Sequence, residues 1–120
     1  MNFKRVYTKE ICGKEYEFKL TTYKAQKLEK ALDESPLVVL NTMATTNKLP
    51  SNEFIFLTMY YALINNKISE QQWGDIIDEC IDNEEINSIY DLLEDVLKIL
   101  AVSGYIDEQA LNEAQNNEKN

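Results

Sequence analysis

The 120-residue chain contains no histidine and has only three glycines, two prolines and two cysteines. Without histidine it lacks the commonest general base, the usual proton switch near neutral pH and the commonest metal ligand. So few turn-forming residues argue against an all-β sandwich or barrel, which needs many turns. Cys12 and Cys80 are far apart in the sequence and match no zinc or redox spacing, which predicts reduced thiols in a cytoplasmic protein.

The chain also lacks a hydrophobic run long enough to cross a membrane. The most apolar stretch, residues 54–64, has eleven residues and is interrupted only by Thr58. A bilayer requires about 20 apolar residues, so this stretch is expected to be a buried helix. The first residues show no signal-peptide pattern. With 44% hydrophobic and 28% charged residues, the composition is that of a globular domain with one core.

Residues 4–20 show the alternating pattern of a β-hairpin. Gly13-Lys14 is the expected two-residue turn, which would pair Ile11 with Tyr16. The alternation makes one face of the hairpin largely apolar. Two strands alone are marginal in water, so helices must cover that face.

Residues 21–106 show helical periodicity throughout. Capping signals stand at Thr21 or Thr22, at Ser35-Pro36, at Ser51 and in the capping box Ser69–Gln72. They predict helices that begin near residues 22 and 36, and further helices over 52–65, 70–82 and 84–103, with a loop at 45–50 and Gly104 as the last cap. The predicted fold is α+β and mostly helical, with an N-terminal hairpin packed on a small bundle of about five helices. One domain spans residues 1–106, and a short helix and polar tail occupy 107–120.

Charge is distributed unevenly along the chain. Residues 1–30 carry eight basic and four acidic side chains, a net charge of +4, whereas residues 31–120 carry four basic and seventeen acidic ones, a net charge of −13. The net charge of −9 for the whole chain disfavours binding to nucleic acid or to an anionic membrane. Aromatic and basic residues interleave in the hairpin, as in some single-strand binders, but we assign those aromatics to the core.

Nine carboxylates and no basic residue lie between positions 75 and 95. They fall between the apolar positions of two predicted helices, so we expect them to face solvent or a partner. One interpretation is a solvated face that keeps the protein soluble, and another is a docking surface for a basic, helical partner. The basic hairpin and first helix can also neutralise part of this charge. The predicted contacts on this face are Asp78, Asp82, Asp91, Glu94 and Asp95.

No catalytic or metal-binding motif is recognisable. Di-iron bundles need Glu-x-x-His pairs, and a calcium loop needs a glycine that residues 78–85 lack. The chain has no glycine-rich phosphate loop and no nucleophile elbow. We therefore expect a protein that is not an enzyme and has no cofactor or metal. Apolar surface left uncovered on helix 52–65 offers a second contact, with Tyr60 and Tyr61 first.

The run from Glu10 to Leu20 contains the pattern Gly-Lys-x-Tyr-x-Phe-x-Leu-Thr, with the threonine at position 21. It is followed by Leu28-Glu29-Lys30-Ala31-Leu32 and Ser35-Pro36-Leu37, and later by Leu49-Pro50-Ser51, Ile68-Ser69 and Val102-Ser103-Gly104-Tyr105. In order and spacing, these motifs over about residues 8–106 resemble the tail assembly chaperones of long-tailed phages and prophages of Gram-positive bacteria.

The resemblance implies a β-hairpin followed by a small helical domain, and a role in assembly. Such chaperones bind the long helical tape measure protein, keep it soluble and help recruit tail tube subunits around it. They act in the host cytoplasm and are absent from the finished virion. The family has no catalytic residues, and a homo-oligomer is left open.

Two other classes of protein compete with this interpretation. An acidic inhibitor or DNA mimic would carry rows of exposed carboxylates with little apolar surface among them. A metal-dependent enzyme would gather its carboxylates in a pocket.

Overall fold

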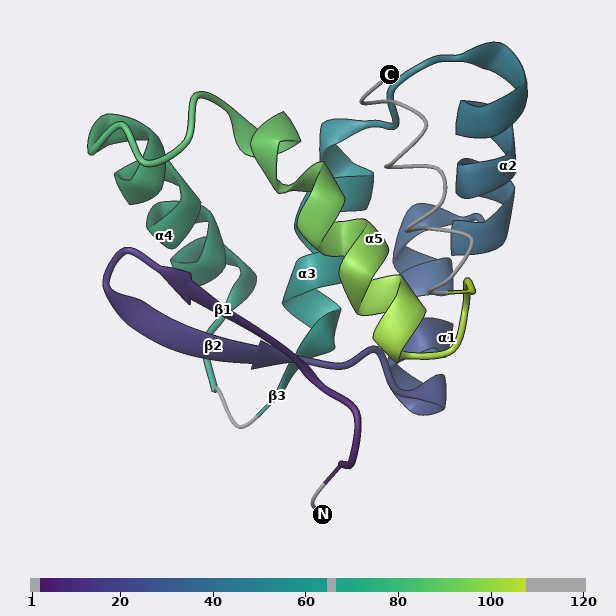
Figure 1. Ribbon diagram of the computed structural model, residues 1–120, viewed down its shortest axis with the longest axis horizontal. Coiled ribbons are helices and arrows are strands. Elements are labelled where there is room, and N and C mark those ends of the chain that lie inside the picture. Colours follow the sequence, from purple (N-terminus) through teal and green to yellow (C-terminus); the bar gives the residue numbers. More distant parts are fainter. Residues whose placement is uncertain (1–2, 65–66, 108–120) are drawn as a thin grey trace.

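The computed structural model describes residues 3–64 and 67–107, which form the predicted α+β, mostly helical fold (Figure 1). The described residues contain a three-stranded antiparallel sheet and five α-helices. The predicted short helix and polar tail at 107–120 lie outside the described residues, apart from Asp107. The elements are β1 (Tyr7–Ile11), β2 (Lys14–Phe18), α1 (Thr22–Leu32), α2 (Pro36–Thr46), α3 (Asn52–Ala62), β3 (Leu63–Ile64), α4 (Glu70–Asp82), the 3₁₀-helix η1 (Ile89–Leu92) and α5 (Leu93–Val102).

Strands β1 and β2 form the predicted hairpin, but its turn lies one residue earlier than expected. Lys9 pairs with Tyr16, so the predicted pairing of Ile11 with Tyr16 is wrong by two residues. The turn residues are Cys12 and Gly13, with φ of 51° and 77°. Two consecutive positive φ values match the twist of the flanking strands, as in a type I′ turn. A slip of two residues preserves the alternation of faces, so Tyr16 is still buried.

The third strand was not predicted. Residues 63 and 64 were expected to end a helix over 52–65, but α3 ends at Ala62. Leu63 instead pairs with Phe18 on the free edge of β2, and the Lys19 N–H donates to the Ala62 carbonyl at 2.8 Å. This pairing satisfies backbone groups on the edge of β2, which would face solvent if residues 63 and 64 continued the helix.

The predicted starts of the first four helices are confirmed, with Thr21 the first cap. Ser35, Ser51 and Ser69 also accept backbone hydrogen bonds as caps, and Ser69 forms the full capping box with Gln72. Helix α2 continues to Thr46, so the predicted loop at 45–50 begins two residues late.

The predicted helix over 84–103 is wrong in its first part. The Glu84 and Glu85 N–H groups bond to the carbonyls of Ile81 and Cys80 and close α4, with Glu84 at φ 61°. Ser88 then caps η1, and α5 follows directly. The end is as predicted, since Gly104 has φ 91° and the Tyr105 N–H reaches the Leu100 carbonyl, a Schellman motif.

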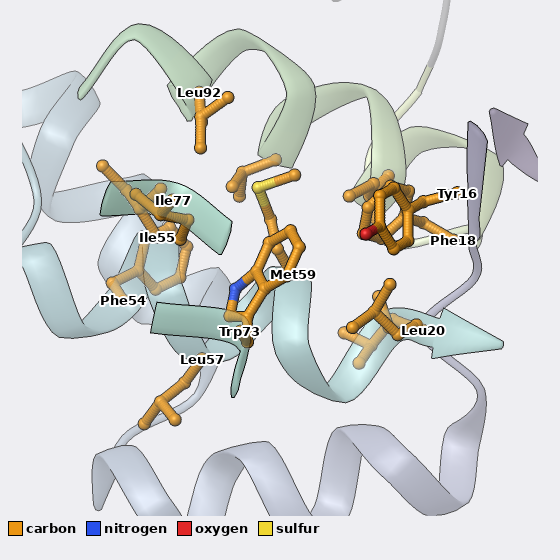
Figure 2. Close-up of a cluster of buried hydrophobic side chains, with 14 of the residues drawn as sticks. Tyr16, Phe18, Leu20, Phe54, Ile55, Leu57, Met59, Trp73, Ile77 and Leu92 are labelled. Carbon is orange, nitrogen blue, oxygen red and sulfur yellow. The ribbon is translucent and has the colours of Figure 1, made fainter. Parts of the chain in front are cut away.

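The core lies between the sheet and the helices, with α3 at its centre (Figure 1). Trp73 from α4 is fully buried, and its ring meets Tyr16 and Phe18 of β2 edge to face, with centroids 6.1 and 6.2 Å apart. Figure 2 shows Trp73 beside Met59 of α3 within this cluster. Burial of these large side chains is the main stabilising term of the fold.

Candidate functional site

Eight of the nine carboxylates predicted to face outward are exposed. Four of them occupy one face of α4 at i, i+3, i+4 and i+7, beginning with Asp75. Asp91 also accepts the Asn87 N–H at 2.7 Å, and Glu94 lies 3.4 Å from Lys98, so part of the set is engaged locally. We call the eight residues the acidic surface: Asp75, Asp78, Glu79, Asp82, Glu84, Glu85, Asp91 and Glu94.

Asp95, the ninth carboxylate, is buried, and its predicted place in a docking surface is wrong. It is 5% exposed, accepts a hydrogen bond from the Tyr7 hydroxyl and pairs with Lys9 at 3.1 Å. The basic hairpin therefore neutralises part of the acidic charge, one of the alternatives left open by the sequence. Helical spacing is the sequence signal for this burial, since it places Asp95 on the same face as Leu92 and Ile99, and that face is buried.

The half-buried Tyr7 hydroxyl makes the fold sensitive to alkaline pH. Burial, the hydrogen bond to Asp95 and the nearby negative charges raise the pKa of Tyr7 well above its usual value of 10.0. Burial and the contact with Cys12 also raise the pKa of the Cys80 thiol from 9.0 to about 12. Above those usual values the unfolded chain releases protons that the folded chain retains, so the unfolded state becomes favoured.

We therefore expect these two groups to leave the free energy of unfolding unchanged between pH 7 and about pH 9, to lower it from about pH 9 upward and to lower it more steeply above about pH 10. Urea unfolding at pH 8, 9, 10 and 11 measures this trend. Tyr7→Phe is the control, because it removes the Tyr7 part of the decline while leaving the parts due to Cys80, Tyr16 and Tyr105, whose pKa values burial also raises. Equal stability at pH 8 and pH 11 would contradict the expectation.

Tyr60 and Tyr61 are half-buried on α3. Their rings meet each other edge to face at 5.4 Å, and the Tyr60 hydroxyl donates to the Ile68 carbonyl at 3.1 Å. The remainder of α3 is deeply buried, with six residues in the core. The two tyrosines are thus mainly packing residues, and little apolar surface of α3 is left around them.

Among the described residues, the exposed large aliphatic side chains lie on or just after α2, which the sequence did not single out, and Tyr23 of α1 and Tyr90 of η1 are also exposed. Leu37 and Val38 are each 49% exposed, and Leu49 just beyond the helix is 69% exposed. Pro36 is the one buried residue of α2, and the helix carries no charged side chain. Figure 1 shows α2 at the edge of the molecule beside α1, away from the sheet. We call Leu37, Val38 and Leu49 the α2 surface.

A groove of about 350 Å³ runs between the start of α3, helix α4 and residues 87–90. Phe56 and Tyr90 contribute rings to its lining, and Asp78 contributes a carboxylate. Of the predicted contacts, Asp78 lines this groove, whereas Asp82, Asp91 and Glu94 do not. The structure therefore does not gather the predicted residues into one pocket, and they belong to an extended exposed face.

The structure brings together Cys12 and Cys80, although they are distant in sequence. Their Sγ atoms are 2.8 Å apart, and the Cys12 N–H donates to the Glu85 carboxylate at 3.0 Å. Within the described ranges, these three residues are the one group of potential metal ligands whose donor atoms lie within 4.8 Å of one another. Sequence spacing could not reveal the group, because it depends on the hairpin turn docking against the end of α4.

Comparison of the chain with models of protein families, with curated proteins and with solved structures finds no match. Across residues 3–64 and 67–107, no helix combines the length and the apolar character needed to cross a bilayer. The geometry and chemistry of the protein's own surfaces are therefore the basis for a proposed function, since no comparison supplies one.

Proposed function

We propose that this protein is a non-enzymatic tail assembly chaperone that acts in the host cytoplasm and is absent from the finished virion. It binds the tape measure protein and helps recruit tail tube subunits around it. The observation that supports this proposal is the α2 surface, an apolar patch at a helix without charged side chains, on a protein with a net charge of −9.

Helix α2 has the character of an element completed by a partner. An isolated helix of eleven residues is marginal in water, and most helices of that length are held by burying an apolar face. In α2 Pro36 is buried and Val39 and Leu40 pack against the core, but Leu37 and Val38 remain half exposed. An amphipathic helix of the tape measure protein laid against α2 would remove these side chains from water on both partners.

The acidic surface has a separate role in this proposal. Its charge keeps the complex soluble and raises the association rate with a basic helical segment. Each domain offers a small apolar area, so a single contact is weak. Many copies along one long tape measure protein, or a homo-oligomer of the chaperone, would bind tightly through multivalency.

The test is co-expression with the tape measure protein encoded in the same genome. Wild-type protein is expected to keep it soluble and to copurify with it. The double variant Leu37→Gln/Val38→Thr should weaken binding about tenfold or more, because each side chain loses roughly 1 kcal/mol of further burial. Asn41→Ala, an exposed position on the same helix, is the matched control and should bind as wild type does.

Two results would count against this function. One is a tape measure protein that stays insoluble with the wild-type protein. The other is a double variant that binds as tightly as Asn41→Ala while circular dichroism shows both to be folded.

An acidic inhibitor or DNA mimic that binds a basic protein is the second candidate. The four exposed carboxylates on one face of α4 favour it. The quadruple variant Asp75→Asn/Asp78→Asn/Glu79→Gln/Asp82→Asn distinguishes the two functions. An inhibitor would lose its partner with this variant and keep it with Leu37→Gln/Val38→Thr, whereas a chaperone would mainly lose association rate at low salt.

A further inference from the structure

We propose that Cys12 and Cys80 form a reversible redox pair, in which oxidation by a low-molecular-weight disulfide joins the hairpin turn to helix α4 through an intramolecular disulfide. This modification site is independent of the proposed chaperone function. It follows from the position of both thiols in the fold.

Both thiols are held in place by the backbone around them. Cys12 occupies the first turn position of the hairpin, and its N–H is fixed by the Glu85 carboxylate at 3.0 Å. Glu85 is itself placed by the Schellman motif that ends α4, since its N–H bonds to the Cys80 carbonyl at 2.9 Å. These hydrogen bonds hold the hairpin turn against the end of α4, next to the two sulfur atoms.

The remaining distance to a covalent bond is small. The Sγ atoms are 2.8 Å apart, and a disulfide bond is about 2.05 Å long. A movement of less than about 1 Å closes the bond, within the freedom of two side chains. At this distance Cys80 attacks a mixed disulfide on Cys12 far faster than a thiol from solution does, because no second molecule must be brought in.

The two cysteines have different exposure and therefore different roles. Cys12 is half-buried at the molecular surface, whereas Cys80 is 2% exposed. Burial, the hydrogen bond with Cys12 and nearby negative charge raise the pKa of the Cys80 thiol to about 12, which keeps it protonated and unreactive toward outside reagents. Cys12 is the attacking residue, and Cys80 resolves the mixed disulfide.

The chemistry balances with one disulfide reagent. The Cys12 thiol gives its proton to water, and its thiolate attacks one sulfur of the reagent. The S–S bond of the reagent breaks, and the leaving thiolate takes a proton from water. The mixed disulfide removes the Cys12 hydrogen bond and charge that help to raise the pKa of Cys80, so Cys80 then gives its proton to water and its thiolate attacks the Cys12 sulfur. The new Cys12–Cys80 bond releases the second thiol, so the protein loses two electrons and two protons and the reagent is reduced to two thiols.

A metal site is the competing use of the same group. Two thiolates on one tetrahedral zinc, each about 2.3 Å from the ion, stand roughly 3.8 Å apart, and the 2.8 Å separation is well short of that. The Glu85 carboxylate is moreover engaged with the Cys12 backbone. The geometry therefore favours a bond between the thiols.

The test equilibrates the folded wild-type protein in buffers of reduced and oxidised glutathione, followed by alkylation and mass spectrometry. Oxidised protein should take up no alkyl group, contain no disulfide between two chains and yield a peptide pair joined through Cys12 and Cys80. It should also melt about 10 °C or more above the reduced form, because the bond closes a long loop in the unfolded chain. Cys80→Ser should stop at a glutathione adduct on Cys12, and Cys12→Ser should stay unmodified while folded.

Four outcomes would overturn the proposal. Three of them are a glutathione adduct on wild-type Cys12 that never resolves, disulfide-linked dimers as the main product, and an oxidised form that melts no higher than the reduced one. The fourth is tight binding of added Zn²⁺ that protects both cysteines of the reduced protein from alkylation, which would make the pair a metal site.

Discussion

Trp73→Ala is expected to lower the free energy of unfolding by about 4 kcal/mol, the largest loss for a single side chain of this protein. Trp73 is fully buried and packs edge to face on Tyr16 and Phe18, so its removal leaves a cavity between α4 and the sheet. A domain of this size is stable by only about 5–15 kcal/mol, so the variant should be close to unfolding at 37 °C. Urea unfolding followed by circular dichroism measures the loss, since the variant has no tryptophan to report it.

Trp73→Phe is the matched variant. The Trp73 Nε1 atom is buried and has no hydrogen-bond partner among the described residues, so exchange for phenylalanine breaks no hydrogen bond. It keeps most of the aromatic packing, and we expect a loss of roughly 1–2 kcal/mol. Trp73→Ala and Trp73→Phe with equal effects would show that the ring does not support the contact between α4 and β2.

Local signals in the sequence predicted most of the fold. Helix caps such as Ser51 and Ser69 act within four residues, so the pattern that predicts them is complete in a short window. Strand β3 depends instead on pairing with β2, which is distant in the sequence. A helix and a two-residue strand were therefore not distinguishable from residues 52–65 alone.

The candidate surfaces were predicted less completely, for the same physical reason. Periodicity predicted that α2 is a helix, but the exposure of Leu37 and Val38 depends on how the other elements pack around α2. The contact between Cys12 and Cys80 spans 68 residues. The exposed carboxylates of α4 were predictable because a helix face without apolar residues is solvated in almost any packing.

The interaction of Asp95 also changes how the acidic residues should be tested. Reversing Glu94 and Asp95 to lysine together would weaken partner binding by unfolding the protein, because Asp95 is paired inside the domain with Lys9 and Tyr7. Only the exposed carboxylates, such as Asp78 and Asp82, can be changed without that effect. Loss of binding in any variant of Asp95 therefore says nothing of a docking surface.

Asp95→Ala is expected to lower the free energy of unfolding by about 3 kcal/mol. The substitution leaves the half-buried Tyr7 hydroxyl without its acceptor and Lys9 without its partner, and removal of one member of a buried pair is strongly destabilising. Glu94→Ala is the matched control on the preceding residue. Its ion pair with Lys98 is largely exposed, and we expect a loss below about 1 kcal/mol.

Thermal and urea unfolding of the two variants at pH 7 measure the difference, and Tyr7→Phe combined with Asp95→Ala completes a double-mutant cycle. Because Tyr7 and Asp95 share one hydrogen bond, the double variant should be about 1 kcal/mol or more stabler than the sum of the two single losses predicts. Equal losses for Asp95→Ala and Glu94→Ala would place Asp95 at the surface. They would return it to the residues available for a partner, and they would remove the electrostatic link between the hairpin and α5 on which this part of the fold depends.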